Sequence, residues 1–417
     1  MNKRKTPAIR FKGYQNDWEQ RKVGELTNVL SASRVHKEEW AEDGIPFFRS
    51  SDVVSAFKGT ENKKAFISIE LYEQLAKSSG KLEQNDILIT GGGSIGIPYI
   101  VPDNKPLYSK DADLIWIKHS ANFDSRYLYT YFISEEFREY LASISHMGTI
   151  AHYTIEQVKD TPVRLPSIDE QRELGDFFVS LDHLITLHQR KLDKLKILKK
   201  TMLENCFPQK GESVPRVRFG GFTGDWEQRK LSDVVERITR KNQNLECTFP
   251  LTISAQYGLI DQNEFFDKRI ASKDVCGYYL IRKGEFAYNK STSVDAPWGA
   301  IKRLDRYESG VLSTLYIVFR ILDESQTDSD YLVTYYETDL WHKDVQAIAA
   351  EGARNHGLLN IAPADFFKTT LMYPQDIEEQ QLIGCYFKSL DNLITLHQCK
   401  LEKLQTIKKS LLRSMFV

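Results

Sequence analysis

Two stretches of the chain place apolar side chains at a helical spacing. Within residues 168–207 these positions fall seven residues apart, and the same spacing recurs within residues 375–417. The repeating positions are Leu181, His188, Leu195 and Met202 in the first stretch, and Leu390, His397, Leu404 and Leu411 in the second. This spacing is typical of a long helix with one apolar seam.

Further apolar positions lie beside each seam, and we expect positively charged residues on the outer face of the first helix. The companions are Ile185 and Leu192, widened by Leu184 and Leu198, and in the second stretch Ile394 and Leu401. We assign to the outer face of the first helix Arg190, Lys191, Lys194, Lys196, Lys199 and Lys200. Neither helix could bury its seam alone. We therefore expect the two helices to pack on each other as a coiled coil; the alternative is that each packs on its own domain.

Local signals mark where the helices start and stop. Pro166 precedes the first helix, and Ser167-x-x-Glu170 matches a capping box. Pro208 follows the helix and ends it. In the second copy Pro374 stands in the place of Pro166.

The segments between the helices mix strand and helix patterns. In residues 21–165 the predicted strands are Asp86–Thr90 and Leu114–Ile117, followed by helices at Tyr127–Ser134 and Glu135–Ile144. In residues 229–373 they are Thr248–Ser254, Gly284–Tyr288 and Leu315–Ile321, followed by a helix at Tyr331–Trp341. Strands come first and helices late in both segments. This order predicts two divergent copies of one α+β domain.

The chain is internally duplicated, but unevenly. Residues 11–22 reappear as 219–230 with Asp-Trp-Glu-Gln-Arg-Lys unchanged, and residues 180–192 reappear as 389–401. The sequence between these near-copies is barely similar. A protein that binds two different sites at a fixed separation would have this layout, whereas an enzyme with one active site would not need it.

Composition narrows the class of protein. The 417 residues are 41% hydrophobic and carry a net charge of −1, so charge alone would not coat nucleic acid. No apolar run approaches the ~18 residues of a membrane span. Five scattered cysteines without a Cys-x-x-Cys motif are typical of free thiols, and we expect a cytoplasmic protein.

A glycine-rich loop, Gly91–Gly96, follows one predicted strand. It lacks the Gly-Lys-Ser/Thr of a nucleotide loop, and Tyr99 resumes a strand pattern soon afterwards. Two interpretations therefore lead: a tight turn between strands, or a turn whose backbone, at Gly92 and Ser94, approaches a DNA phosphate.

Two further candidate DNA-contacting loops lie late in each variable segment. In His146–Tyr153 the candidates are Thr149, His152 and Tyr153, and in Ala350–Gly357 they are Arg354, Asn355 and His356. Arginine can bond guanine and asparagine adenine in the major groove. The alternative is that both loops are solvated connections.

No catalytic or metal-binding motif can be singled out. The nine histidines form no metal set, and His188 and His397 occupy equivalent seam positions. No catalytic triad, Walker motif or methyltransferase motif is present. A binding or scaffolding subunit is the favoured interpretation.

Taken together, these repeats resemble the specificity subunit of type I restriction-modification systems. The resemblance rests on the repeated Leu-Asp-x-Leu-Ile-Thr-Leu-His-Gln run, the Trp-Glu-Gln-Arg-Lys segments, and helices that begin near Glu170-Gln171 and Glu379-Gln380. The second of these starts is one residue further from its proline. Within the second variable segment, Gly284–Asn289 and Gly310–Ser313 resemble one subgroup of target-recognition domains, which adds Asn289 to the DNA-binding candidates.

The resemblance implies an architecture. Two target-recognition domains would be joined by two long antiparallel helices in a pseudo-twofold repeat. The implied divisions are a conserved segment at 1–20, target-recognition domains at 21–165 and 211–374, and conserved helices at 166–210 and 375–417.

The resemblance also implies function and partners. Each domain would read half of an asymmetric site on double-stranded DNA, while the helices set the gap and dock two modification (methyltransferase) subunits. This chain would be non-catalytic and hold no cofactor or metal. S-adenosylmethionine, ATP and Mg²⁺ would belong to the modification subunits and to the restriction subunits that translocate and cleave DNA. The alternatives are a stand-alone nuclease and a repeat scaffold that binds only proteins.

Overall fold

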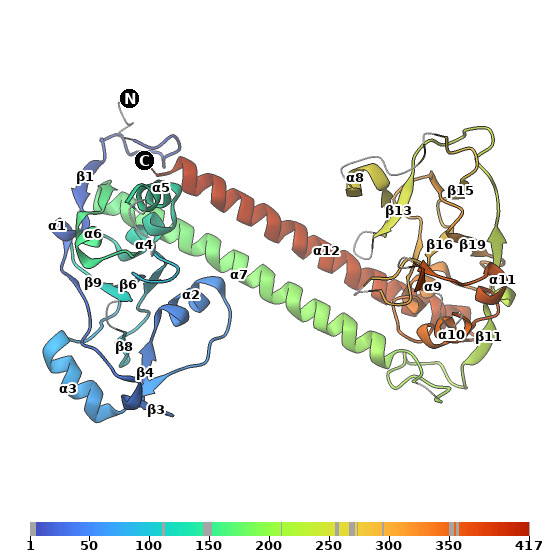
Figure 1. Ribbon diagram of the computed structural model, residues 1–417, viewed down its shortest axis with the longest axis horizontal. Helices are drawn as coiled ribbons and strands as arrows, with labels where there is room; N and C mark the ends of the chain where they lie inside the picture. The colour runs from blue at the N-terminus through green and yellow to red at the C-terminus, as the bar shows by residue number, and fades with distance from the viewer. Residues whose placement is uncertain are drawn as a thin grey trace. The chain divides into compact units, whose positions relative to one another are not determined.

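The chain forms two compact units (Figure 1). The computed structural model describes residues 6–110, 113–144, 152–209, 211–254, 258–266, 272, 274–293, 296–349, 354–355 and 358–416. Unit 1 comprises residues 1–190 and 398–417, and unit 2 comprises residues 191–397. The unit boundaries fall within the two long helices, α7 (Ile168–Asn205) and α12 (Ile377–Ser414).

Unit 1 contains the following elements besides its share of α7 and α12. The strands are β1 (Glu19–Lys22), β2 (Val29–Leu30), β3 (Trp40–Ala41), β4 (Ile45–Phe48), β5 (Phe66–Ile67), β6 (Ile87–Thr90), β7 (Pro98–Ile100), β8 (Tyr108–Ser109), β9 (Leu114–Ile117) and β10 (Pro162–Leu165). The helices are α1 (Val23–Leu26), η1 (Lys37–Glu39), α2 (Ser50–Lys58), α3 (Ile69–Ser79), α4 (Ser125–Ile133), α5 (Glu135–Ile144) and α6 (Ile155–Asp160).

Unit 2 is built from a comparable set. Its strands are β11 (Glu227–Lys230), β12 (Val235–Ile238), β13 (Leu251–Ser254), β14 (Gly258–Asp261), β15 (Tyr279–Arg282), β16 (Phe286–Asn289), β17 (Ala300–Arg303), β18 (Ser309–Leu312), β19 (Ile317–Ile321), β20 (Arg354–Asn355), β21 (Leu358–Leu359) and β22 (Thr370–Tyr373). Its helices are η2 (Leu231–Asp233), α8 (Gln262–Phe266), α9 (Ser329–Tyr335), α10 (His342–Ile348) and α11 (Pro363–Phe366).

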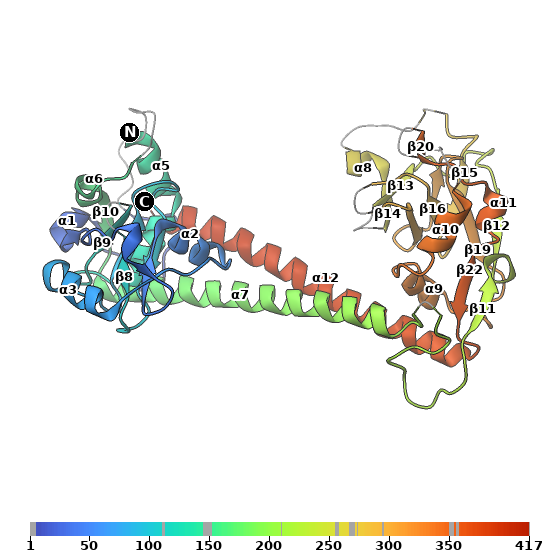
Figure 2. The ribbon, with the colours of Figure 1, turned by 60° about the horizontal axis from the view of Figure 1, so that its bottom comes forward.

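The main sheet has the same strand order in both units. It runs β2-β9-β6-β7 in unit 1 and β12-β19-β16-β17 in unit 2, with every pair antiparallel. A separate pair also repeats: β1 pairs with β10, and β11 with β22, in the same register. Figure 2 shows β11 beside β22. The predicted α+β class is confirmed, and the main sheet and this pair have the same topology in both units despite their dissimilar sequences.

The central strands are mostly apolar because both of their faces are covered. In β6 the side chains of Ile87 and Ile89 enter the core that contains α4 and α5, while Leu88 enters a second core with Val53 of α2. In unit 2, Phe286 and Tyr288 of β16 likewise enter the main core. Alternating residues thus fill two cores, which explains a continuous apolar run in place of strict alternation.

An aromatic cluster at the base of each unit joins the domain to the helices. In unit 1 Phe416, just after α12, lies 5.6 Å from Tyr127 and 6.0 Å from Phe178 of α7 between ring centroids. In unit 2 the duplicated Phe207, just after α7, lies 5.8 Å from Tyr331 and 6.4 Å from Phe387 of α12. The far end of one helix therefore packs against the start of the other within each unit.

The helices are antiparallel within each unit. In unit 1 Asp182 pairs with Lys408 at 2.5 Å, while Phe178, earlier in α7, contacts the later Phe416. In unit 2 Lys199 pairs with Asp391 at 2.5 Å, while the later Phe207 contacts the earlier Phe387. The paired stretches lie side by side in Figures 1 and 2. Among the described helices, none is long and apolar enough to cross a membrane.

The apolar seam is narrower than the sequence suggested. Its predicted positions are buried or half-buried: Leu181, His188, Leu195, Met202, Leu390, His397, Leu404 and Leu411. Leu184 and Leu198, expected to widen the seam, are 46% and 42% exposed, so this expectation is wrong. Lys199, assigned to the outer face, instead occupies a seam position with its side chain only 16% exposed. Its ammonium is tolerated there because it has carboxylate partners.

Three other local predictions need correction. Helices are not confined to the end of unit 1, since α2 and α3 precede β6. The helix expected at Tyr331–Trp341 breaks after Tyr335, and α10 starts at His342. The Ser167 hydroxyl does accept the Glu170 amide at 3.4 Å, but the Glu170 carboxylate binds Arg10. Both long helices begin at equivalent isoleucines, so the extra residue after Pro374 lies before α12.

Candidate nucleic-acid interface

In each unit, the loop after a central strand contacts the later segment that contains the other candidate DNA-binding residues. In unit 1 the backbone N–H of Tyr153 donates to the carbonyl of Gly91, just after β6, at 2.8 Å. In unit 2 the N–H of Leu359 donates to the carbonyl of Lys290, just after β16, at 3.0 Å. The structure therefore brings the two predicted regions together, at the same place in both units.

The unit 1 loop is a tight turn between β6 and β7. The N–H of Gly96 donates to the carbonyl of Thr90 at 2.7 Å, and that of Ile97 to its hydroxyl at 2.8 Å. Gly96 has φ +71°, and a Cβ there would lie 2.3 Å from Leu141 Cδ1. Only glycine suits such a position. The tight-turn interpretation is confirmed, and a strand rather than a nucleotide-binding helix follows the loop.

The two candidates in this turn differ in accessibility. Gly92 is buried, and a Cβ there would lie 2.7 Å from Asp113 Oδ1, whereas Ser94 is exposed. Two cations that sequence reasoning missed lie beside the turn. Lys110 pairs with Asp113, and Arg138 donates to the carbonyl of Ile95 at 3.4 Å, with its pKa lowered by burial. No local motif marks these cations, because only folding brings them to the turn.

The late segment of unit 1 offers one accessible side chain among its described residues. His152 is exposed, but Tyr153 is 1% exposed and its hydroxyl is bonded to Thr161. Burial raises the pKa of Tyr153 above its ordinary value. These contacts favour a core role for Tyr153 over base contact. Thr149 lies outside the described residues.

The corresponding region of unit 2 is organised around Asn289 and Lys290. Asn289 is half-buried at the end of β16, and its side-chain oxygen accepts the N–H of Ser291 at 3.0 Å. Lys290, adjacent in sequence but missed, donates to the carbonyl of Ile361 at 3.3 Å, and burial lowers its pKa. The sequence signal for Lys290 was its position directly after this strand, at the start of a loop.

Arg354 and Asn355 lie on a short strand rather than in an irregular loop. Their strand β20 pairs antiparallel with β21, with Arg354 opposite Leu359. Leu359 of β21 is hydrogen-bonded to Lys290, so β21 and its partner strand β20 lie beside the end of β16. The side chains of Arg354 and Asn355, and all of His356, lie outside the described residues. Among the described residues, no group of three or more His, Cys, Asp or Glu side chains could hold a metal ion.

Comparison with known proteins relates this chain to DNA specificity subunits. Residues 15–197 match the family model described as the type I restriction modification DNA specificity domain. A putative type I restriction enzyme specificity subunit of Haemophilus influenzae is 28% identical over 171 residues, or 39% of this chain and 41% of that protein. The type I restriction enzyme MjaVIII specificity subunit of Methanocaldococcus jannaschii is 22% identical over 229 residues, or 53% of this chain and 49% of that protein.

The chain thus spans about half the length of the curated relatives it matches. The fold extends further. The crystal structure of a type I restriction-modification S subunit from M. genitalium aligns with 99% of both chains at a TM-score of 0.61 and 13% identity. Residues 15–197 are thus similar to a type I restriction-modification DNA specificity domain, and the fold of the whole chain is similar to that of a type I S subunit.

Proposed function

We propose that this chain is a non-catalytic subunit that recognises DNA sequence for a type I restriction-modification complex. Each unit would read one half of a bipartite, asymmetric site on double-stranded DNA. The observation that carries the proposal is the contrast between scaffold and loops. The strand order of the main sheet and the separate strand pair (β1–β10 and β11–β22) repeat in both units. The loops after β6 and β16 differ in sequence and length.

The chemistry of these loops suits DNA. Ser94 and His152 are exposed in unit 1, and Asn289 is half-buried in unit 2, so each unit offers different hydrogen-bonding groups for base edges. The cations Lys110 and Arg138 beside one turn, and Lys290 beside the other, would contact phosphates. A chain with a net charge of −1 can bind DNA in this way only through such local placement of positive charge.

A repeated exposed leucine pair supports docking of two identical partners. Leu184 and Leu187 of α7 are 46% and 47% exposed, and their duplicates Leu393 and Leu396 of α12 are 42% and 46% exposed. Exposed apolar groups that recur at equivalent positions are suited to binding the same partner twice. We propose that each pair docks one modification subunit, which binds S-adenosylmethionine and methylates adenine.

Restriction subunits would join the same complex in the cytoplasm and supply ATP- and Mg²⁺-dependent translocation and cleavage. This chain would then need no cofactor of its own. The similarity to specificity subunits and the two exposed leucine pairs support this division of labour between subunits.

The docking surfaces can be tested one at a time. Leu184→Asp or Leu393→Asp should each yield a complex that lacks one modification subunit, measured as the mass of the purified assembly. The control is Ile197→Asp, because Ile197 is 66% exposed on α7 and its counterpart is a threonine, Thr406. Full assembly of both leucine variants would exclude these pairs as docking sites.

The function itself is tested by methylation mapping. The chain would be expressed with its modification subunit in a host without adenine methylation, and modified adenines located by sequencing. We expect one bipartite motif with an unread gap, and none without the chain. Methylation independent of the chain, or DNA cleavage by the purified chain with Mg²⁺, would overturn the proposal.

A further inference from the structure

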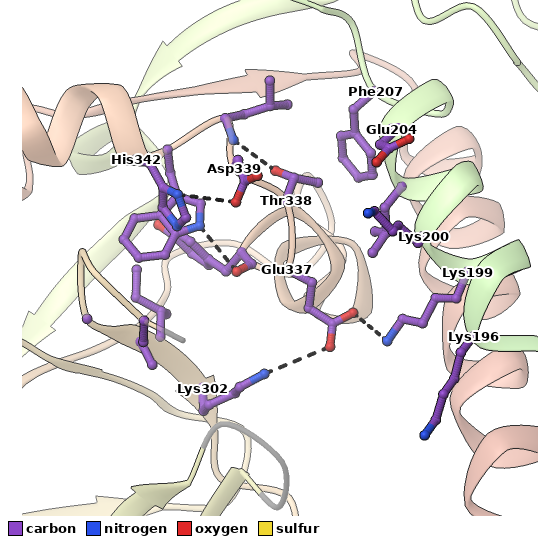
Figure 3. A pocket seen from close by; sticks show the side chains of 18 of the residues that line it. Lys196, Lys199, Lys200, Glu204, Phe207, Lys302, Glu337, Thr338, Asp339 and His342 are labelled. Atoms are coloured by element: carbon purple, nitrogen blue, oxygen red, sulfur yellow. Dashed lines mark hydrogen bonds and ion pairs between the residues drawn. The ribbon is translucent and has the colours of Figure 1, made fainter. Parts of the chain in front are cut away.

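Unit 2 contains a cavity of about 670 Å³ between α7 and the recognition domain (Figure 3). Lys196, Lys199 and Lys200 of α7 line one side, and Lys302 of β17 and Glu337, after α9, line the other. In Figure 3 the Glu337 carboxylate points between two of these lysines. It lies 2.8 Å from Lys199 Nζ and 3.9 Å from Lys302 Nζ.

Lys199 also contacts the second long helix. Its Nζ lies 2.5 Å from Asp391 Oδ1 on α12, so one ammonium joins α7, α12 and the segment after α9. Burial lowers the pKa of Lys199, but the carboxylates of Glu337 and Asp391 raise it by more, and the amine stays charged. A largely buried cation held by two carboxylates restricts geometry more than an exposed pair does.

Unit 1 contains the same helix–helix pair without the third partner. Lys408 and Asp182 are the duplicates of Lys199 and Asp391, and they also lie 2.5 Å apart. When Asp124 and Asp328, which cap α4 and α9, are aligned, the position of Glu337 is taken by Ile133. Lys408 therefore has no carboxylate at that position of its domain. Among the residues that the structure describes, the three-way contact occurs in unit 2 and not in unit 1.

We propose that Lys199, through Glu337, fixes the orientation of the second recognition domain on the helix pair and so limits the half-site gaps that the complex accepts. The aromatic cluster around Phe207 and the Lys388–Asp330 pair between α12 and α9 also hold this domain, but apolar packing is non-directional and a largely exposed ion pair contributes little. Charge-assisted hydrogen bonds are directional and resist rotation of the domain. Lys199 is thus a positioning residue, and its role rests on the proposed function.

The test compares gap preference in the assembled modification complex. DNA duplexes would carry both half-sites with the native gap, or with a gap one base pair longer or shorter. We expect Lys199→Met and Glu337→Gln each to reduce the preference for the native gap roughly tenfold, which is the loss of one charge-assisted hydrogen bond. Discrimination against single-base changes within the half-sites should not change.

Lys408→Met is the matched control, because it removes the helix–helix pair of unit 1 without a domain contact. We expect it to leave gap preference unchanged. The double variant Lys199→Met/Glu337→Gln should be no worse than Lys199→Met alone, because both changes break the Lys199–Glu337 contact.

Several outcomes would overturn the positioning role. These are an unchanged gap preference in Glu337→Gln, additive effects in the double variant, or an equal loss in Lys408→Met. A wild-type complex that does not distinguish gap lengths at all would instead refute the proposed function, so the two failures are separable.

Discussion

At the scale of single residues, both units contain the same buried ion pair at the start of their long helix. Arg10 binds Glu170 through Nε–Oε1 and Nη2–Oε2 contacts of 2.6 and 2.8 Å, and Arg218 binds Glu379 at 2.7 and 2.8 Å. Both carboxylates are 1% exposed. Each pair ties the segment before β1 or β11 to the first turn of α7 or α12, where the helix dipole also favours the carboxylate.

Glu170→Gln should therefore destabilise unit 1. The Arg10 guanidinium, with its side chain 14% exposed, would remain charged without its partner, and the expected cost is about 3 kcal/mol. Denaturant unfolding of the purified chain measures it. Asp169→Asn is the control one residue earlier, because the Asp169–Arg172 pair is exposed and should cost under about 1 kcal/mol. Equal losses in the two variants would contradict the structural role of the buried pair.

Arg354 remains the sharpest base-contact prediction. If it binds a guanine, Arg354→Ala should lower discrimination at one base pair of the second half-site by about 1–3 kcal/mol and leave the first half-site untouched. If it binds phosphate, affinity should fall for all sequences and the salt dependence should become shallower. Affinities for the site and its single-base variants at two salt concentrations distinguish these results. An unchanged profile would leave Arg354 without a DNA contact.

At the scale of elements, the helix pair combines an apolar seam with charges at fixed points. Lys199 and Lys408 occupy seam positions in the two units, each paired with an aspartate of the opposite helix. Polar groups at seam positions are known to fix the register of coiled coils. The exposed leucines outside the seam remain available for partners.

Leu195→Asp should destabilise the helix pair. Leu195 packs against the main core of unit 2, and an aspartate there would have no partner, at a cost of about 3 kcal/mol. Leu198→Asp, three residues later and 42% exposed, should change unfolding by less than about 0.5 kcal/mol. Thermal unfolding followed by circular dichroism compares the two. If Leu198→Asp lowered the stability and Leu195→Asp did not, the assignment of Leu195 to the seam would be wrong.

At the scale of the whole molecule, each recognition domain is inserted between two paired strands. The β1–β10 pair closes unit 1 and the β11–β22 pair closes unit 2, in the same register. These pairs belong to the repeated scaffold, so the domains that they enclose should be exchangeable.

Replacing residues 23–161 with the matching segment of another family member should change one half-site only. The junctions leave the Lys22–Pro162 pairing intact, and Trp18, Phe178 and Phe416 of the aromatic cluster stay in place. Methylation mapping gives the new motif. The reciprocal exchange of residues 231–369 is the control and should change only the other half-site. A change in both half-sites after either exchange would show that both domains take part in recognising each half-site.

The sequence alone determined the elements that repeat or are strongly periodic. The heptad spacing located both long helices, and the apolar runs Asp86–Thr90 and Leu114–Ile117 located β6 and β9 within one residue. It missed α2 and α3, in which few side chains are buried: only Val53 in α2, and only Tyr72 and Ala76 in α3. The break after Tyr335 was also missed, because buried aromatic residues lie on both sides of it and no glycine or proline marks it.

The tertiary structure alone decided which of these elements meet. It placed Tyr153 in the core, brought Lys110 and Arg138 to the turn after β6, and turned Lys199 from the expected outer face toward Glu337 and Asp391. The physical reason is that periodicity shows which face of an element is covered, but not what covers it. The burial of Lys199 depends on carboxylates 138 and 192 residues away in the chain, and only the fold brings those charges together.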